Sequence, residues 1–317
     1  MAAQTTSTQA VYAALIGNLL VAATKLAAAL WTGSSAMLSE AVHSFVDTGN
    51  AVLLLYGIRR AAHPPDAEHP LGYGRELYFW SFIVALLVFA LGAGVSVYEG
   101  VAHIRDPEPI SDPLVNYIVL GCALLFEGGS WAVALRQFRE TKDPLGYYEA
   151  FRRSKDPPSF MVLFEDSAAL IGIVIAALAT CAAVELRAPV LDGIGSILIG
   201  VVLAVVAALL ARESKSLLIG ERADNRLNES ILRIAGAESS VARANGALTV
   251  QLAPDQVVAA VSLDFADELS AGDIEEKVAD IERKIRAAHP QIVALFVKPQ
   301  TDKSFRQAVR RRLGEGT

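Results

Sequence analysis

The chain has 317 residues, of which 53% are hydrophobic, and its mean hydropathy of +0.39 is too high for an ordinary soluble enzyme. Its formal net charge of −6 says little about partners because the sign varies along the chain, and no nucleic-acid partner is expected. Apolar residues fall in blocks up to about residue 212, after which the sequence becomes charged. We therefore predict two domains, 1–212 and 213–317.

Six apolar runs have the length of a membrane-spanning helix, which takes about 20 residues. They are Val11–Trp31, Ala36–Gly57, Phe79–Val97, Val115–Ala134, Phe160–Val184 and Val190–Ala211. Lys and Arg concentrate in the connections after the second, fourth and sixth runs, and the turn after the first run has none. Because basic residues favour the cytoplasmic side, we predict that both termini are cytoplasmic. The N-terminus lacks the basic region of a signal peptide, so the first run is expected to be retained.

Isolated polar residues within these runs have structural interpretations. Asn18 is expected to hydrogen-bond a neighbouring helix, and Lys25 to extend its ammonium toward the membrane surface. Asp192 begins the sixth run, where a carboxylate favours a helix start. Cys122 and Cys181 lie in apolar runs without a CxxC pair, so we predict buried free thiols rather than a disulfide or a zinc-thiolate site.

The second run carries an ionisable pair, His43 and Asp47, four residues apart and therefore on one helix face. In the fifth run Asp166 lies about 6 residues from the predicted cytoplasmic end, against about 10 for Asp47, so the depths agree within about 6 Å. Imidazole nitrogen and carboxylate oxygens suit Zn²⁺, and less exclusively Fe²⁺, Co²⁺, Mn²⁺ or Cd²⁺. We predict that His43, Asp47 and Asp166 bind one divalent ion near the middle of the membrane.

This ligand set also suggests what the site does. Two carboxylates offset a divalent charge that hydrocarbon would not tolerate, and the same ligands can take protons when the metal leaves. Metal release coupled to protonation is metal/proton antiport. Glu127, in the fourth run, either joins the site or pairs with another polar group. No HExxH or serine-nucleophile motif accompanies the ligands, which argues against an intramembrane hydrolase and against an enzyme in general.

The C-terminal part reads as a small α+β domain. Ser270 and Asp273 resemble a helix N-cap, and Pro290 stops the helix that follows. The tail around Arg311 is expected to be a solvated helix end. The remaining predicted elements are a helix over Asp224–Ile234, a hairpin of Leu248–Leu252 and Val257–Phe265, and a strand over Ile292–Val297.

Three stretches resemble the cation diffusion facilitator family of divalent-metal transporters: Thr32–Asp47, His69–Arg75 and Glu165–Ala169. The last is similar to the branch that includes zinc transporter nine. The resemblance covers nearly the whole chain. It implies a homodimer in the lipid bilayer with six spans, cytoplasmic termini and a ferredoxin-like, metallochaperone-like C-terminal domain. It also implies a transport site made of the two second-run ligands and the fifth-run aspartate.

The chain departs from the family pattern at several places, two of which concern the metal sites of the spans and of the loop after the second run. Val162 stands where the family often has a fourth ligand, one turn before the fifth-run aspartate, which leaves Glu165, Glu127 or water to complete the shell. Glu165 ranks first because it adjoins the site. Asp66 and His69 match a secondary metal site of relatives, but a tyrosine replaces its histidine, so that site is expected to be weak or absent.

These observations together predict a secondary transporter. It would export divalent cations, Zn²⁺ first, from the cytoplasm in exchange for protons by alternating access, in an inner or cytoplasmic membrane and without a permanent cofactor. The alternative is a non-transporting membrane metal sensor or partner subunit. Three costly polar groups in the membrane argue against that alternative, because a scaffold has no need of them.

Overall fold

The computed structural model describes residues 2–141 and 146–313, and the chain divides into two compact units. The larger unit comprises Met1–Arg60 and Glu76–Lys215, and the smaller comprises Ala61–Arg75 and Ser216–Thr317. The second division point falls close to the domain boundary expected from the sequence. The loop 61–75, however, groups with the C-terminal part rather than with the helices that flank it.

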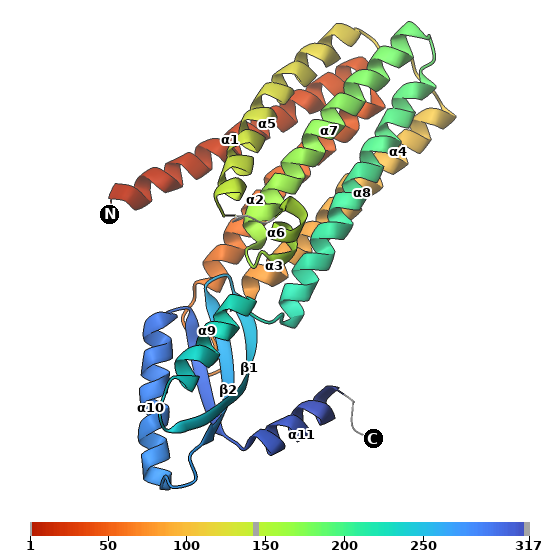
Figure 1. Ribbon diagram of the computed structural model, residues 1–317. Helices are drawn as coiled ribbons and strands as arrows, with labels where there is room; N and C mark the ends of the chain where they lie inside the picture. Colours follow the sequence, from red (N-terminus) through yellow and green to blue (C-terminus); the bar gives the residue numbers. More distant parts are fainter. Residues whose placement is uncertain (1, 142–145, 314–317) are drawn as a thin grey trace. The chain divides into compact units, whose positions relative to one another are not determined.

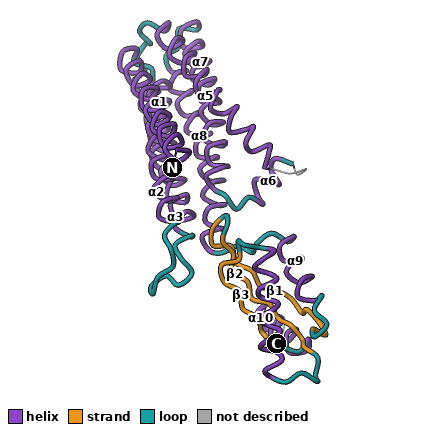
Figure 2. Tube along the Cα trace, turned by 90° about the vertical axis from the view of Figure 1, so that its left-hand side faces the viewer, coloured by secondary structure: helices purple, strands orange, loops and turns teal. Residues whose placement is uncertain are grey.

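The larger unit is a helical bundle whose long helices run beside one another (Figures 1 and 2). A π-helical turn, η1, joins α3 to α4, so that the third predicted run forms one nearly continuous helix. The bounds of the elements are α1 (Ala2–Thr32), α2 (Ser35–Ala61), α3 (Glu76–Leu87), η1 (Val88–Ala93), α4 (Gly94–Arg105), α5 (Pro113–Thr141), α6 (Tyr147–Arg153), α7 (Pro157–Glu185) and α8 (Val190–Ile219).

Five of the described helical segments are long and apolar enough to cross a membrane: those of α1, α3 to α4, α5, α7 and α8. The remaining predicted span is the second run, α2, which has 27 residues or about 40 Å of helix. It carries Glu40, His43 and Asp47 within its length, and by composition it is not counted with the other five. Six spans are therefore not confirmed, and the exception is the helix that carries His43 and Asp47.

The turn between α1 and α2 is fixed by Gly33 and by Asp192 at the start of α8. Gly33 has a φ of +70°, a conformation that glycine adopts without strain. One oxygen of Asp192 accepts a hydrogen bond from Ser34 Oγ at 2.9 Å, and the other accepts from the backbone N–H of Ala36 at 3.2 Å. Asp192 thus lies in the first turn of α8, as predicted, and also holds the start of α2.

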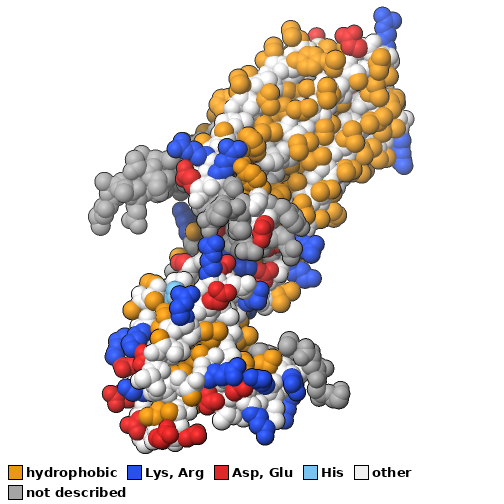
Figure 3. Space-filling model, in the orientation of Figure 1, with side chains coloured by type: hydrophobic (Ala, Val, Ile, Leu, Met, Phe, Trp, Pro, Cys, Tyr) orange, Lys and Arg blue, Asp and Glu red, His pale blue; other side chains and the backbone are white. Residues whose placement is uncertain are grey.

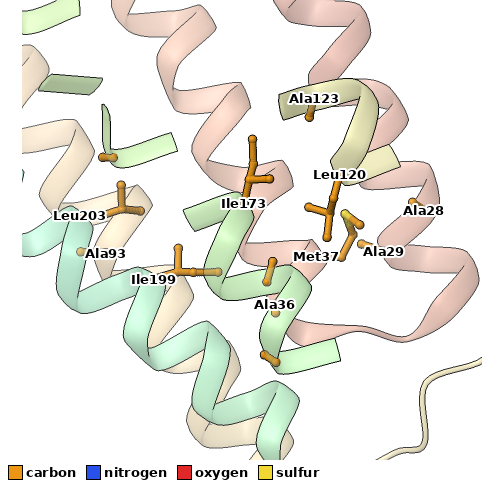
Figure 4. Packing of buried hydrophobic residues seen from close by; sticks show 13 residues of the cluster. Ala28, Ala29, Ala36, Met37, Ala93, Leu120, Ala123, Ile173, Ile199 and Leu203 are labelled. Atoms are coloured by element: carbon orange, nitrogen blue, oxygen red, sulfur yellow. The ribbon is translucent and has the colours of Figure 1, made fainter. Parts of the chain in front are cut away.

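The core of the bundle is built largely from small side chains. Ala28, Ala36, Ile173 and Ile199 come from four different helices and pack in one cluster (Figure 4). Small residues let helix backbones approach closely, which is the usual packing of helices in membranes. Larger hydrophobic side chains cover the visible outer face of the helices (Figure 3).

Cys122 and Cys181 are exposed on the bundle, so the prediction that they are buried is wrong. The physical reason is that apolar residues of a spanning helix point outward to lipid as readily as inward. Membership of an apolar run therefore does not imply burial within the protein.

The C-terminal part of the smaller unit is a mixed three-stranded sheet of order β1-β2-β3 with helices. β1 pairs antiparallel with β2, and β2 pairs parallel with β3. Residues of α9 and α10 share one core with the strands, among them Ile231, Leu263 and Ile281. The bounds are α9 (Asn225–Gly236), β1 (Val241–Ala253), β2 (Gln256–Phe265), α10 (Ala271–Ala288), β3 (Ile292–Pro299) and α11 (Asp302–Leu313).

Every element predicted for this domain is present, with differences at the ends. β1 begins at Val241 rather than at Leu248, and α11 extends far upstream of the predicted helix end. The N-cap of α10 is confirmed: Ser270 Oγ accepts a hydrogen bond from the Asp273 N–H at 3.2 Å, and Asp273 accepts one from the Ser270 N–H at 2.9 Å. This reciprocal pair is a capping box.

Candidate metal centre

A cavity of about 320 Å³ lies among α1, α2, α5 and α7. Three carboxylates from three different helices line it: Asp47 from α2, Glu127 from α5 and Asp166 from α7. The other lining residues are Gly17, Asn18, Val21, Ser44, Phe126, Ser130 and Ala169. Asn18 and Ser130 were not predicted as site residues; their polar side chains in otherwise apolar helices were the available signal.

His43 and Asp47 lie together on one face of α2, as their spacing predicts. The Nδ1 atom of His43 is 3.4 Å from Oδ1 of Asp47, and the imidazole is almost completely buried. Both ring nitrogens of His43, and Oδ1 of Asp47, lack a hydrogen-bond partner among the described residues. Unpartnered buried polar atoms are costly. A bound cation or proton would satisfy these atoms.

The neighbouring carboxylates of α7 point to different places. Asp166 Oδ2 accepts a hydrogen bond from Ser130 Oγ at 2.8 Å and lines the cavity. Glu165 is buried and accepts a hydrogen bond from Asn50 Nδ2 at 2.9 Å; it is not among the described residues that line the cavity. Successive helical residues are turned by about 100°, which explains the divergence.

Lys25 is completely buried, so the prediction that its ammonium extends to the membrane surface is wrong. Its Nζ donates to Glu127 Oε1 at 2.7 Å, to Ser44 Oγ at 2.9 Å and to Glu40 Oε2 at 3.0 Å. Two carboxylates thus offset the cost of burying the ammonium. Sequence reasoning missed Glu40, although any ionisable residue in an apolar run needs a partner.

The predicted ligands lie at or next to one cavity, but they do not form a complete metal-binding site. Asp47 and Asp166 line one cavity, and His43 adjoins Asp47. Within residues 2–141 and 146–313, no three His, Cys, Asp or Glu side chains are close enough together to hold a metal ion. What the arrangement offers is an open set of oxygen and nitrogen donors around a cavity.

The second predicted site lies in the loop 61–75, where Asp66 and His69 are half exposed. Asp66 Oδ1 accepts hydrogen bonds from the N–H groups of Glu68 at 2.9 Å and His69 at 2.7 Å, and Oδ2 accepts from the Tyr73 hydroxyl at 2.7 Å. The Tyr73 hydrogen bond, followed by that of the His69 N–H, lowers the pKa of Asp66. The carboxylate that a metal would need therefore holds the loop together.

Comparison with known proteins identifies the family. The model of the cation efflux transmembrane domain matches residues 11–219. The proton-coupled mitochondrial zinc antiporter SLC30A9 of Xenopus laevis is 37% identical over 62% of this chain and 35% of its own length, and the human protein is 36% identical over 62% and 35%. Metal tolerance protein C4 of Arabidopsis thaliana is 34% identical over 74% of this chain and 52% of its own.

The chain spans about a third to a half of the length of these curated relatives, 35% of the Xenopus antiporter and 52% of the Arabidopsis protein. The family match covers well over half of the chain, including the candidate ligands His43, Asp47 and Asp166. The apolar helices agree with a domain that crosses the bilayer several times. The chain is therefore a multi-pass integral membrane protein of the cation efflux family, the cation diffusion facilitators, and it resembles the SLC30A9 branch.

Proposed function

We propose that this protein exports divalent cations, Zn²⁺ first, from the cytoplasm in exchange for protons. The observation that carries the proposal is the cavity in which Asp47 and Asp166 approach from two helices, beside a buried His43 with both ring nitrogens unpartnered. The relatives named as proton-coupled zinc antiporters support both the ion and the counter-ion. Mn²⁺, Fe²⁺, Co²⁺ and Cd²⁺ are the alternative ions for this donor set.

In this proposal the metal is the transported substrate. The carboxylates of Asp47 and Asp166 bind it and offset its charge, and His43 contributes a neutral ring nitrogen. When the ion leaves, the unpartnered atoms of His43 and Asp47 accept protons, which lowers the free-energy cost of burying them without the metal. Alternating access supplies the movement of α2 against α7 that would bring the three ligands together around the ion.

We further propose that α2 is a sixth span, that both termini are cytoplasmic and that the protein is a homodimer. The 27-residue length of α2 and the alternation of basic connections support the first two points. The homodimer is inferred from the family resemblance. A cysteine placed in the loop 61–75 should react with an impermeant reagent only in inside-out vesicles, and light scattering should give the mass of two chains. Labelling from the outside, or a monomer mass, would contradict these proposals.

The test of transport uses sealed proteoliposomes with Zn²⁺, Mn²⁺, Fe²⁺ and Cd²⁺, each with and without a pH gradient. We expect gradient-driven uptake of Zn²⁺ that is lost in Asp47→Ala. Glu140→Gln is the matched control, because Glu140 is an exposed carboxylate on α5 that pairs only with its helical neighbour Arg136 in the described ion pairs. That variant should transport normally.

Each outcome has a distinct meaning. Normal Zn²⁺ flux in Asp47→Ala would refute the assignment of the site. Flux that ignores the pH gradient would leave metal transport standing and remove proton exchange. No flux of any ion, from folded protein, would favour the sensor or partner-subunit alternative. Turnover of a peptide or lipid would instead point to a hydrolase.

A further inference from the structure

We propose that Glu127 on α5 supplies the metal ligand that α7 lacks at Val162, and that the buried Lys25 is the residue that positions it. This inference rests on the proposed function of the cavity. It moves the completion of the metal shell from the fifth predicted span to the fourth, and it gives a role to a buried ammonium that the family resemblance does not explain.

Glu127 has one oxygen fixed and one unpartnered. Oε1 accepts the hydrogen bond from Lys25 Nζ at 2.7 Å, whereas Oε2 is buried and has no hydrogen-bond partner among the described residues. The side chain lines the same cavity as Asp47 and Asp166. A carboxylate held by one oxygen, with the other unsatisfied in a cavity that two further carboxylates line, is suited to receive a cation.

Glu165, the other candidate for the additional metal ligand, is less suited to that role than Glu127. Its Oε1 accepts a hydrogen bond from Asn50, and the described lining of the cavity does not include it. Glu165 is turned by about 100° around α7 from Asp166, which does line the cavity. Glu127 already lines the cavity.

Lys25 is itself held in place, which is what allows it to orient Glu127. Its Nζ donates to Glu40 and to Ser44, both on α2, and both the lysine and Glu40 are fully buried. A Cβ added at Gly172 of α7 would overlap Oε1 of Glu40, so the glycine leaves room for this carboxylate. The ammonium is thus fixed from α2, and it sets which oxygen of Glu127 remains for the cavity.

The ligand role is tested by measuring Zn²⁺ dissociation constants of the full-length protein in detergent, by competition with a fluorescent chelator. Glu127→Gln keeps a carbonyl oxygen that can accept from Lys25 but loses the second anionic oxygen. We expect its dissociation constant to rise about tenfold or more. Glu140→Gln, on the same helix and far more exposed, should match the wild type. Unchanged affinity in Glu127→Gln, or a loss in Glu165→Gln alone, would overturn the proposal.

The positioning role is tested by additivity. Lys25→Met combined with Glu40→Gln removes the ammonium and one of its two carboxylate partners, so that the net charge is unchanged and Glu127 loses its hydrogen bond from Nζ. If Lys25 acts through Glu127, this double variant should bind Zn²⁺ about tenfold more weakly, and adding Glu127→Gln should weaken binding no further. A purely structural role predicts losses that add, and full additivity would refute the positioning role.

The two proposals fail in distinguishable ways. Wild-type protein that binds and transports Zn²⁺, together with a Glu127→Gln variant of normal affinity and KM, would remove this inference and leave the proposed function intact. Wild-type protein that binds no Zn²⁺ would overturn both.

Discussion

Helices α4 and α8 approach each other backbone to backbone at Gly100. A Cβ at this position would lie 2.6 Å from the carbonyl oxygen of Gly193 and 2.6 Å from Cγ1 of Ile197. In Gly100→Ala these atoms must recede to the 3.4 Å of ordinary van der Waals contact. Because the obstacle includes backbone, the helices have to separate, and a gap of about 0.5–1 Å forfeits a quarter to a half of each attractive contact. We expect a loss of about 1–3 kcal/mol in the free energy of unfolding.

Gly121→Ala on α5 is the matched control. A Cβ there meets no described atom within 4 Å, so the variant keeps its packing and gains helix propensity of up to about 1 kcal/mol. Unfolding of both variants in detergent micelles, by titration with a denaturing detergent, should therefore separate them by about 1–4 kcal/mol. Equal stabilities would show that α4 and α8 do not approach backbone to backbone.

Three further predictions concern polar contacts outside the cavity. The pKa of Asp66 is lowered, so its ionised carboxylate stabilises the folded loop fully at pH values above the ordinary aspartate pKa. This stabilisation is lost as the pH falls through the lowered pKa. Tyr73→Phe should move that loss to higher pH, so that pepsin begins to cleave the loop 61–75 at a higher pH than in the wild type. Cleavage with the same pH dependence in both proteins would contradict this prediction. Asp192→Ala removes both hydrogen bonds to the α1–α2 turn and should lower the unfolding free energy by about 1–3 kcal/mol, where an unchanged value would argue against this contact. Ser270→Ala and Asp273→Ala should each destabilise the C-terminal unit by about 1 kcal/mol in thermal unfolding, because each breaks the capping box. A melting temperature equal to that of the wild type would refute this prediction.

Local features of this protein were predictable from the sequence because their cause is local. The helix over Val190–Ile219 contains its predicted run, because a long apolar stretch in a membrane must form its backbone hydrogen bonds within the segment. The Ser270 capping box depends on residues three apart, and the shared face of His43 and Asp47 depends on residues four apart. Such spacings fix geometry before any tertiary contact forms.

The pairing of the buried charges was decided only by the tertiary structure. From the sequence, Lys25 is expected to extend toward the membrane surface, because its two carboxylate partners lie 15 and 102 residues away, on α2 and α5. Which of Glu165 and Asp166 faces the cavity depends on how α7 is rotated against α2, and that rotation is set by packing along the whole helix. The sequence by itself thus determined which residues are costly in a membrane. The packing of four helices decided which of them meet, because contacts between distant segments depend on helix rotation and close approach rather than on spacing.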